Sequence, residues 1–197
     1  SHPRKRRVMN DDAISVTMLV IDVLDALNVP YVIGGSLASA MHGVARTTLD
    51  SDLVADLRLE HVAPFVEQLR DQFYVSADAF IDALIHQSSF NLIHLETMFK
   101  VDIFIPKQRL FDQQQLQNRI AFDITTNPKQ TAYLASPEDT ILAKLEWFRL
   151  GGEVSERQWR DVIGIIQVQA DRLNHDYLHR LSTEMNLSDL LEKALHV

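Results

Sequence analysis

Residues 31–54 read YVIGGSLASAMHGVARTTLDSDLV, and the rest of the chain can be interpreted around them. An apolar run enters a Gly-Gly-Ser turn, a short helix is predicted over 36–42, and a second strand then carries Asp50 and Asp52. Residues two apart on a strand point to the same face, so both carboxylates can bind one cation. Ligands that offer only oxygen suit Mg2+ or Mn2+, which also bind substrate phosphates.

The turn at Gly34, Gly35 and Ser36 precedes a helix and is therefore a candidate phosphate site. Backbone N–H groups at a helix N-terminus attract anions, and glycines let a ligand approach the backbone closely. A third carboxylate, Asp102, interrupts the apolar segment KVDIFI at 100–105. An unpaired carboxylate is costly to bury, whereas a bound cation favours its ionised form. A metal ion shared with the first two acids would remove this cost.

These residues together resemble the nucleotidyltransferase superfamily of DNA polymerase beta. Its signature is a hydrophobic residue, Gly-Gly or Gly-Ser, a short spacer, and Asp-x-Asp followed by a third acid on a later strand. The resemblance covers residues 30–105 and implies an α/β (α+β) fold, a minimal core of mixed β-sheet and helices. It also implies that Asp50, Asp52 and Asp102 are catalytic and hold Mg2+ (or Mn2+). Asp102 is the candidate base for the acceptor hydroxyl, and Ser36 could donate a hydrogen bond to a phosphate oxygen.

Two cations are candidates for binding the nucleotide. Arg46 precedes the acids, and we weigh a bidentate phosphate contact equally against a salt bridge that holds its loop. The chain resembles most closely the small bacterial nucleotidyltransferases of the AbiEii toxin type and their uncharacterised relatives. That resemblance implies that Lys144 reaches toward the triphosphate, although a solvated helix lysine is an equal alternative. The segment 155–165 matches theirs at Arg157 and Asp161, whereas Gly164 stands where they carry a second Asp.

Composition limits the class of protein. The chain has 197 residues, of which 46% are hydrophobic and 23% charged, and it has no cysteine. No apolar run approaches the ~18 residues of a membrane span, and no signal-peptide core is visible, so we expect a cytoplasmic protein without a membrane partner. The net charge of −8 slightly disfavours long nucleic acids as substrates and favours a cationic small molecule.

The chain divides into three predicted parts. Residues 1–10 are interpreted as a disordered tail or one left from cloning, 11–135 as the nucleotidyltransferase core, and 136–197 as a C-terminal helical subdomain. Asp11 or Asp12 is expected to begin the first helix. Segments 90–95 and 100–105 are expected to form a hairpin, and Ser136-Pro137 is a typical helix start. His42 is expected to be a structural histidine rather than a substrate contact.

The predicted function is metal-dependent transfer of a nucleoside monophosphate from an NTP to a hydroxyl acceptor. The acceptor is tRNA or a protein in a toxin–antitoxin-type enzyme, or a small molecule such as an aminoglycoside. The alternative is a non-catalytic nucleotide-binding or antitoxin-like interaction module. The preferred base, the acceptor and the oligomeric state stay open.

Overall fold

The fold is built on one mixed, seven-stranded sheet in the order β3-β4-β5-β2-β1-β7-β6. In this computed structural model the backbone is described for residues 2–126 and 129–197, and the side chains for 12–124 and 129–197. β2 pairs in parallel with β5, and β1 with β7, whereas the other neighbours are antiparallel. The strands are β1 Tyr31–Ile33, β2 Asp50–Ala55, β3 Phe73–Tyr74, β4 Ser89–His94, β5 Lys100–Phe104, β6 Ile120–Thr126 and β7 Lys129–Leu134.

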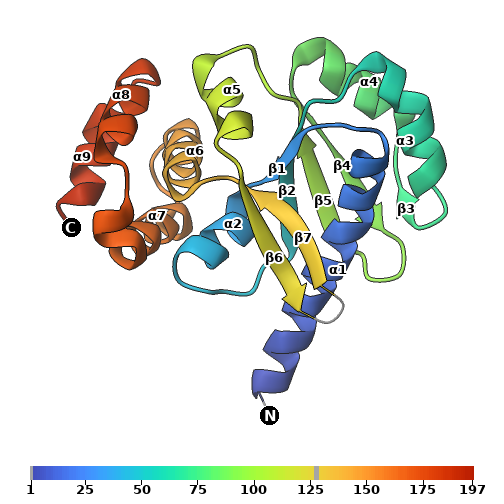
Figure 1. Ribbon diagram of the computed structural model, residues 1–197, viewed down its shortest axis with the longest axis horizontal. Coiled ribbons are helices and arrows are strands. Elements are labelled where there is room, and N and C mark those ends of the chain that lie inside the picture. The colour runs from blue at the N-terminus through green and yellow to red at the C-terminus, as the bar shows by residue number, and fades with distance from the viewer. Residues whose placement is uncertain (1, 127–128) are drawn as a thin grey trace.

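Helices surround this sheet (Figure 1). Those of the first two thirds are α1 His2–Ala26, α2 Gly35–His42, α3 Val62–Leu69, α4 Ala77–His86 and α5 Leu110–Gln117. The last third holds α6 Pro137–Leu150, α7 Glu156–Gln169, α8 His175–Glu184 and α9 Ser188–Leu195, with short 3-10 turns at Leu59–His61 and Ala170–Arg172. In Figure 1 these last helices lie on the left, opposite α3 and α4. The predicted combination of a mixed sheet, helices and a helical C-terminal part is confirmed.

The predicted helix start at Ser136-Pro137 is confirmed by its cap. The Ser136 hydroxyl accepts a hydrogen bond from the backbone N–H of Asp139 at 3.0 Å, and Pro137 occupies the first turn of α6. Ser155 caps α7 in the same way through the N–H of Gln158 at 3.3 Å. Each cap satisfies a backbone donor that has no partner inside its helix.

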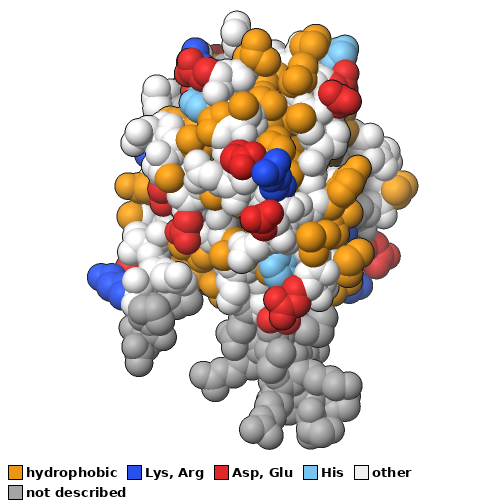
Figure 2. Space-filling model, turned by 90° about the vertical axis from the view of Figure 1, so that its right-hand side faces the viewer, with side chains coloured by type: hydrophobic (Ala, Val, Ile, Leu, Met, Phe, Trp, Pro, Cys, Tyr) orange, Lys and Arg blue, Asp and Glu red, His pale blue; other side chains and the backbone are white. Residues whose placement is uncertain are grey.

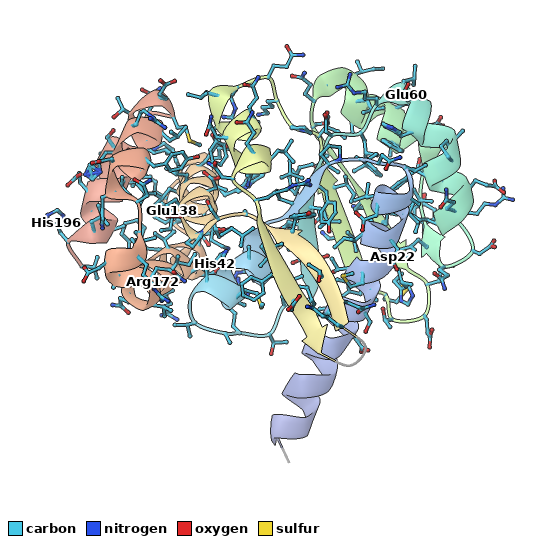
Figure 3. All side chains as sticks on the ribbon, in the orientation of Figure 1. Asp22, His42, Glu60, Glu138, Arg172 and His196 are labelled. Carbon is cyan, nitrogen blue, oxygen red and sulfur yellow. The ribbon has the colours of Figure 1, made fainter. Side chains whose placement is uncertain are left out.

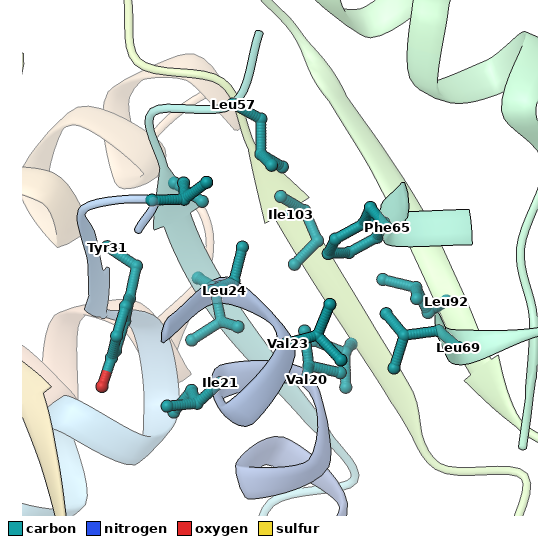
Figure 4. Close-up of a cluster of buried hydrophobic side chains, with 14 of the residues drawn as sticks. Val20, Ile21, Val23, Leu24, Tyr31, Leu57, Phe65, Leu69, Leu92 and Ile103 are labelled. Atoms are coloured by element: carbon teal, nitrogen blue, oxygen red, sulfur yellow. The ribbon is translucent and has the colours of Figure 1, made fainter. Parts of the chain in front are cut away.

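The main hydrophobic core lies between α1, α3 and one face of the sheet (Figure 4). Val20, Ile21 and Leu24 of α1 are fully buried, as are Leu92 and Ile103 of the strands beneath them. Burial alternates along β2 and β5 because successive side chains point to opposite faces. The buried members of these strands face this core, which leaves their acidic members on the opposite face.

A second hydrophobic cluster joins the C-terminal helices to one another and to α5. Its buried side chains include Phe111, Ile141, Leu145, Ile165 and Leu181. The short helix α2 lies against both α6 and α7, so the C-terminal helices pack directly beside the Gly-Gly-Ser turn. This packing brings residues from the last third of the chain to the candidate site.

Two elements differ from the predictions. The first helix begins at His2, before the expected start at Asp11 or Asp12, so its backbone includes residues that were interpreted as a tail. The strand Phe73–Tyr74 was not predicted, because two residues are too few to show an alternating pattern. The expected hairpin of β4 and β5 is confirmed, and Met98 turns its corner with a φ of 59°.

One face of the molecule can be followed in a space-filling view. Figure 2 shows acidic and basic side chains scattered among hydrophobic ones on the face that it presents. Within the described ranges, none of the helices is both long enough and apolar enough to cross a membrane.

Candidate active site

The three predicted carboxylates lie on adjacent parallel strands. β2 carries Asp50 and Asp52, and β5 carries Asp102, with Asp52 directly opposite Asp102 in the register. Neighbouring strands are about 4.8 Å apart, so these two side chains leave the sheet side by side. All three are partly buried on the face away from the main core. The structure therefore brings together the acids that the sequence singled out.

Burial and repulsion between neighbouring carboxylates raise pKa values within this group of acids. Burial, followed by the negative charges of Asp50 and Asp102, raises the pKa of Asp52 to about 6. Burial also raises the pKa of Asp102, although Lys100 opposes the shift with its ammonium 3.5 Å from the Asp102 carboxylate. Positive charge placed among these acids would favour their ionised forms.

The donor chemistry fits a hard divalent cation, because carboxylate oxygens that repel one another are the ligands such an ion prefers. Within residues 12–124 and 129–197, however, no three Asp, Glu or His side chains form a group that could hold an ion as it stands. The acids are neighbours without being a closed ligand set. The assignment of Asp50, Asp52 and Asp102 as metal ligands therefore stays a prediction.

The two glycines of the turn differ in what surrounds them. Gly35 has a φ of +55°, and a Cβ atom there would lie 1.9 Å from Oδ2 of Asp52. A Cβ at Gly34 would meet nothing within 4 Å, and the Gly34 N–H donates to the backbone oxygen of Asp52 at 2.9 Å. Position 35 thus requires a glycine because the backbone lies so close to the Asp52 carboxylate, whereas the space beside Gly34 is open to a ligand.

A second charged group, which we call the cation cluster, consists of Ser36, Arg46, Lys144, Gln158 and Asp161. Arg46 donates through Nε and Nη2 to the two oxygens of Asp161, at 3.0 and 2.8 Å, and through Nη2 to the Ser36 hydroxyl at 2.7 Å. Lys144 donates to Oδ2 of Asp161 at 2.8 Å and to Oε1 of Gln158 at 3.1 Å. The cluster therefore joins α2, the loop after it, α6 and α7.

Burial decides between the alternatives for Lys144. Its side chain is only 5% exposed, so the alternative of a solvated helix lysine is wrong. For Arg46, the salt bridge that holds its loop is observed, and its phosphate contact stays a prediction. The pKa of Lys144 is lowered by burial, against which the Asp161 carboxylate and, less strongly, the charge of Asp52 act. The cation cluster and the carboxylates are thus electrostatically coupled.

Asp161 is the residue that local sequence patterns could not assign to the site. Burial alone would raise its pKa, but the hydrogen bonds from Arg46 and Lys144 outweigh burial and lower it. Arg157, the other match in the same segment, is exposed on α7. Gly164, where a second Asp was expected, faces Val44, and a Cβ there would lie 3.3 Å from the valine side chain. A side chain at position 164 would therefore press on the loop after α2.

His42, the last residue of α2, is buried (Figure 3). Its Nε2 atom is 2.7 Å from the backbone oxygen of Ala135. Burial lowers the pKa of His42, so the neutral ring donates to this carbonyl. Its expected structural role agrees with these contacts.

Comparison with solved structures identifies the fold. No family model and no curated protein matches the sequence. The chain is similar to an antigenic nucleotidyltransferase-like protein from Paracoccidioides brasiliensis, with 21% identity over 91% of each chain and a TM-score of 0.51. It is also similar to the lincomycin-bound lincosamide antibiotic adenylyltransferase LnuA, with 16% identity over 77% of this chain and 95% of that one, and a TM-score of 0.51.

A third similar structure is ANT(2'')-Ia in complex with adenylyl-2''-tobramycin. It has 12% identity, covers 88% of this chain and 96% of its own, and gives a TM-score of 0.57. The nearer resemblance to AbiEii-type enzymes stays a prediction. At these identities the likeness concerns the fold alone, and it agrees with the order of turn, paired acids and third acid described above. The chain has the nucleotidyltransferase fold.

Proposed function

We propose that this protein transfers a nucleoside monophosphate from an NTP to a hydroxyl group. One observation carries the proposal: Asp52 and Asp102 lie opposite each other on parallel strands, and Gly35 of the turn lies against Asp52. The candidate catalytic carboxylates and the candidate phosphate site are thus neighbours. The nucleotidyltransferase fold supports the same proposal.

Each group has a role in this reaction. The triphosphate would lie at the N-terminus of α2, beside Gly34 and Ser36, where backbone N–H groups and the helix dipole favour anions. Arg46 and Lys144 would add positive charge. Asp50, Asp52 and Asp102 would hold Mg2+ or Mn2+, which supplies charge stabilisation for the attacking and leaving oxygens.

In the proposed transfer one bond to the α-phosphorus forms and one breaks. The acceptor oxygen forms a bond to the α-phosphorus, and the bond from that phosphorus to the bridging oxygen of the β-phosphate breaks. Pyrophosphate leaves with the electron pair. The hydroxyl proton passes to the Asp102 carboxylate, which would act as the general base.

For the acceptor we favour a small hydroxyl compound over tRNA or a protein of a toxin–antitoxin system. Two of the similar structures hold lincomycin and adenylyl-2''-tobramycin, which supports a small acceptor. The negative net charge of the chain supports the same choice, because it disfavours a polyanion.

The test is calorimetric titration of ATP, CTP, GTP and UTP, each with Mg2+, into the wild type and an Asp50→Ala/Asp52→Ala variant. A matched control is Asp22→Ala/Asp25→Ala, which removes the same charge from exposed positions on α1. Binding that requires both Mg2+ and the β2 acids would support the transferase. The NTP that binds most tightly would identify the preferred nucleobase. NTP labelled at the α-phosphate, incubated with hydroxylated antibiotics, tRNA or protein, would then identify the acceptor.

A non-catalytic nucleotide-binding module is the second candidate, and one observation favours it. The acids do not form a closed ligand set in the described residues. Nucleotide binding that is unchanged without Mg2+ and in the Asp50→Ala/Asp52→Ala variant would favour this module. Failure of every NTP to bind folded protein would overturn both candidates.

A further inference from the structure

The cation cluster contains one carboxylate for two cations, and this arrangement calls for an explanation. We propose that Asp161 is a positioning residue of the nucleotide site, which holds Arg46 and Lys144 side by side and charged for the triphosphate. This inference rests on the proposed function. It assigns a task to α7, an element that carries none of the residues expected to touch the nucleotide.

The geometry shows how one carboxylate serves both cations. The Nη2 of Arg46 and the Nζ of Lys144 both donate to the same oxygen, Oδ2, at 2.8 Å. The Nε of Arg46 donates to the other oxygen at 3.0 Å, so the guanidinium is held by two parallel hydrogen bonds. Such a bidentate contact fixes the plane of an arginine as well as its place.

The charges of the cluster leave it suited to an anion. Two positive groups face one negative group, so the cluster keeps a net positive charge. The described contacts of Arg46 use Nε and Nη2, which leaves the N–H groups of Nη1 for a phosphate oxygen. Because the same guanidinium binds the Ser36 hydroxyl, this positive charge is fixed at the turn where the triphosphate would lie.

Without Asp161, the two cations would oppose each other. Both lie within hydrogen-bonding distance of one oxygen atom, and Lys144 is buried, so their repulsion would be only weakly screened. Within the described residues, Asp161, Arg46 and Asp52 are the charged groups with the largest effects on the pKa of Lys144. Removing the charge of Asp161 leaves Arg46 to disfavour the ammonium form, against only the weaker opposing effect of Asp52. A neutral Lys144 would contribute much less to phosphate binding.

The test compares Asp161→Asn with the wild type, using Mg-ATP and Mg-tripolyphosphate as probes in calorimetric titrations from pH 6 to pH 9. Tripolyphosphate lacks base and sugar, so it reports on the phosphate contacts alone. We expect the Kd for both probes to rise about tenfold to 100-fold at pH 8, the effect of a charged hydrogen bond. We also expect the loss of affinity with rising pH to begin at lower pH in the variant, because Lys144 loses its proton more readily.

Two further variants separate positioning from a structural role. Asp112→Asn removes a similarly buried carboxylate that pairs with Arg109 at 2.7 Å, outside the cation cluster, and should leave both Kd values unchanged. In a background of Arg46→Gln/Lys144→Gln, adding Asp161→Asn should change the affinity little, because the groups it positions are gone. Circular dichroism and thermal unfolding check that each variant is folded.

The outcomes are distinguishable. A folded Asp161→Asn protein that binds both probes as the wild type does would overturn the inference and leave the proposed function intact. An undiminished loss in the background without the two cations would show that Asp161 acts through the fold alone. An equal loss at every pH would overturn the part of the inference that Asp161 keeps Lys144 charged. A wild type that binds neither Mg-tripolyphosphate nor any of the four Mg-NTPs would overturn the proposed function itself.

Discussion

Replacing Asp52 by Asn should stabilise the protein while abolishing transfer. Burial and its two acidic neighbours raise the pKa of Asp52 from 3.8 to about 6. Each tenfold change in proton affinity corresponds to about 1.4 kcal/mol, so holding the ionised form in the folded state costs about 3 kcal/mol. Asn is neutral and nearly the same size. We therefore expect Asp52→Asn to raise the free energy of unfolding at pH 7.5 by about 1–3 kcal/mol.

The size of this stabilisation depends on pH, because Asp52 titrates at different pH values in the folded and unfolded states. Between pH 3.8 and about 6 the folded state binds more protons at Asp52 than the unfolded state does. The contribution of this group to the free energy of unfolding therefore falls as the pH rises through that window. Below the window Asp52 is protonated in both states, so the advantage of Asn should disappear.

Urea denaturation of the wild type and of Asp52→Asn at pH 7.5, 5 and 4 measures the difference. A variant less stable than the wild type at pH 7.5, or a gain of the same size at pH 4, would refute this electrostatic reasoning. Mg2+ adds a second readout. If the acids bind the ion, MgCl2 should raise the Tm of the wild type at pH 7.5 and have little effect on Asp52→Asn.

The remaining predictions concern the turn, the cation cluster and a second buried acid. Gly35→Ala should lower the free energy of unfolding by more than about 2 kcal/mol, because the added Cβ would collide with Asp52. Gly34→Ala should change the free energy of unfolding by less than about 0.5 kcal/mol, because its Cβ would meet nothing. Urea denaturation of the wild type and both variants measures these differences. Lys144→Met should reduce NTP affinity about tenfold or more in calorimetry, with little change in Tm, because methionine fills the buried space. Burial raises the pKa of Asp139 to about 6, so its contribution to the free energy of unfolding falls as the pH rises from 4 to 6. In urea denaturation across that range, Asp139→Asn should therefore lose less stability with rising pH than the wild type does.

The carboxylates of the site could be predicted because the pattern around each of them is local in the sequence. The spacing of Asp50 and Asp52 places them on one face of any strand, and the apolar residues around Asp102 require a strand as well. The hairpin of β4 and β5 followed from its short turn. The pairing of β2 with β5 brings the acids together, and the resemblance to the nucleotidyltransferase superfamily, rather than a local pattern, implied this grouping.

The other half of the site could not be predicted, because it depends on tertiary contacts. Nothing near Arg46 in the sequence indicates that its partner is Asp161, on a helix of the last third of the chain. The burial of Lys144 likewise results from how α6 and α7 pack, which helical spacing alone does not specify. The open space beside Gly34 and the crowding at Gly35 also appear only when β2 lies beneath the turn.

The separation of Arg46 and Asp161 has a consequence for how the site is assembled during synthesis. The two residues are 115 positions apart, so their ion pair closes one of the longest loops in the chain. A nascent chain that has emerged only through β7 already contains the carboxylates and the turn, but neither Lys144 nor Asp161. Long-range contacts of this kind form late and slow folding. The protein should therefore gain its capacity to hold a triphosphate only when the last helices have left the ribosome and docked.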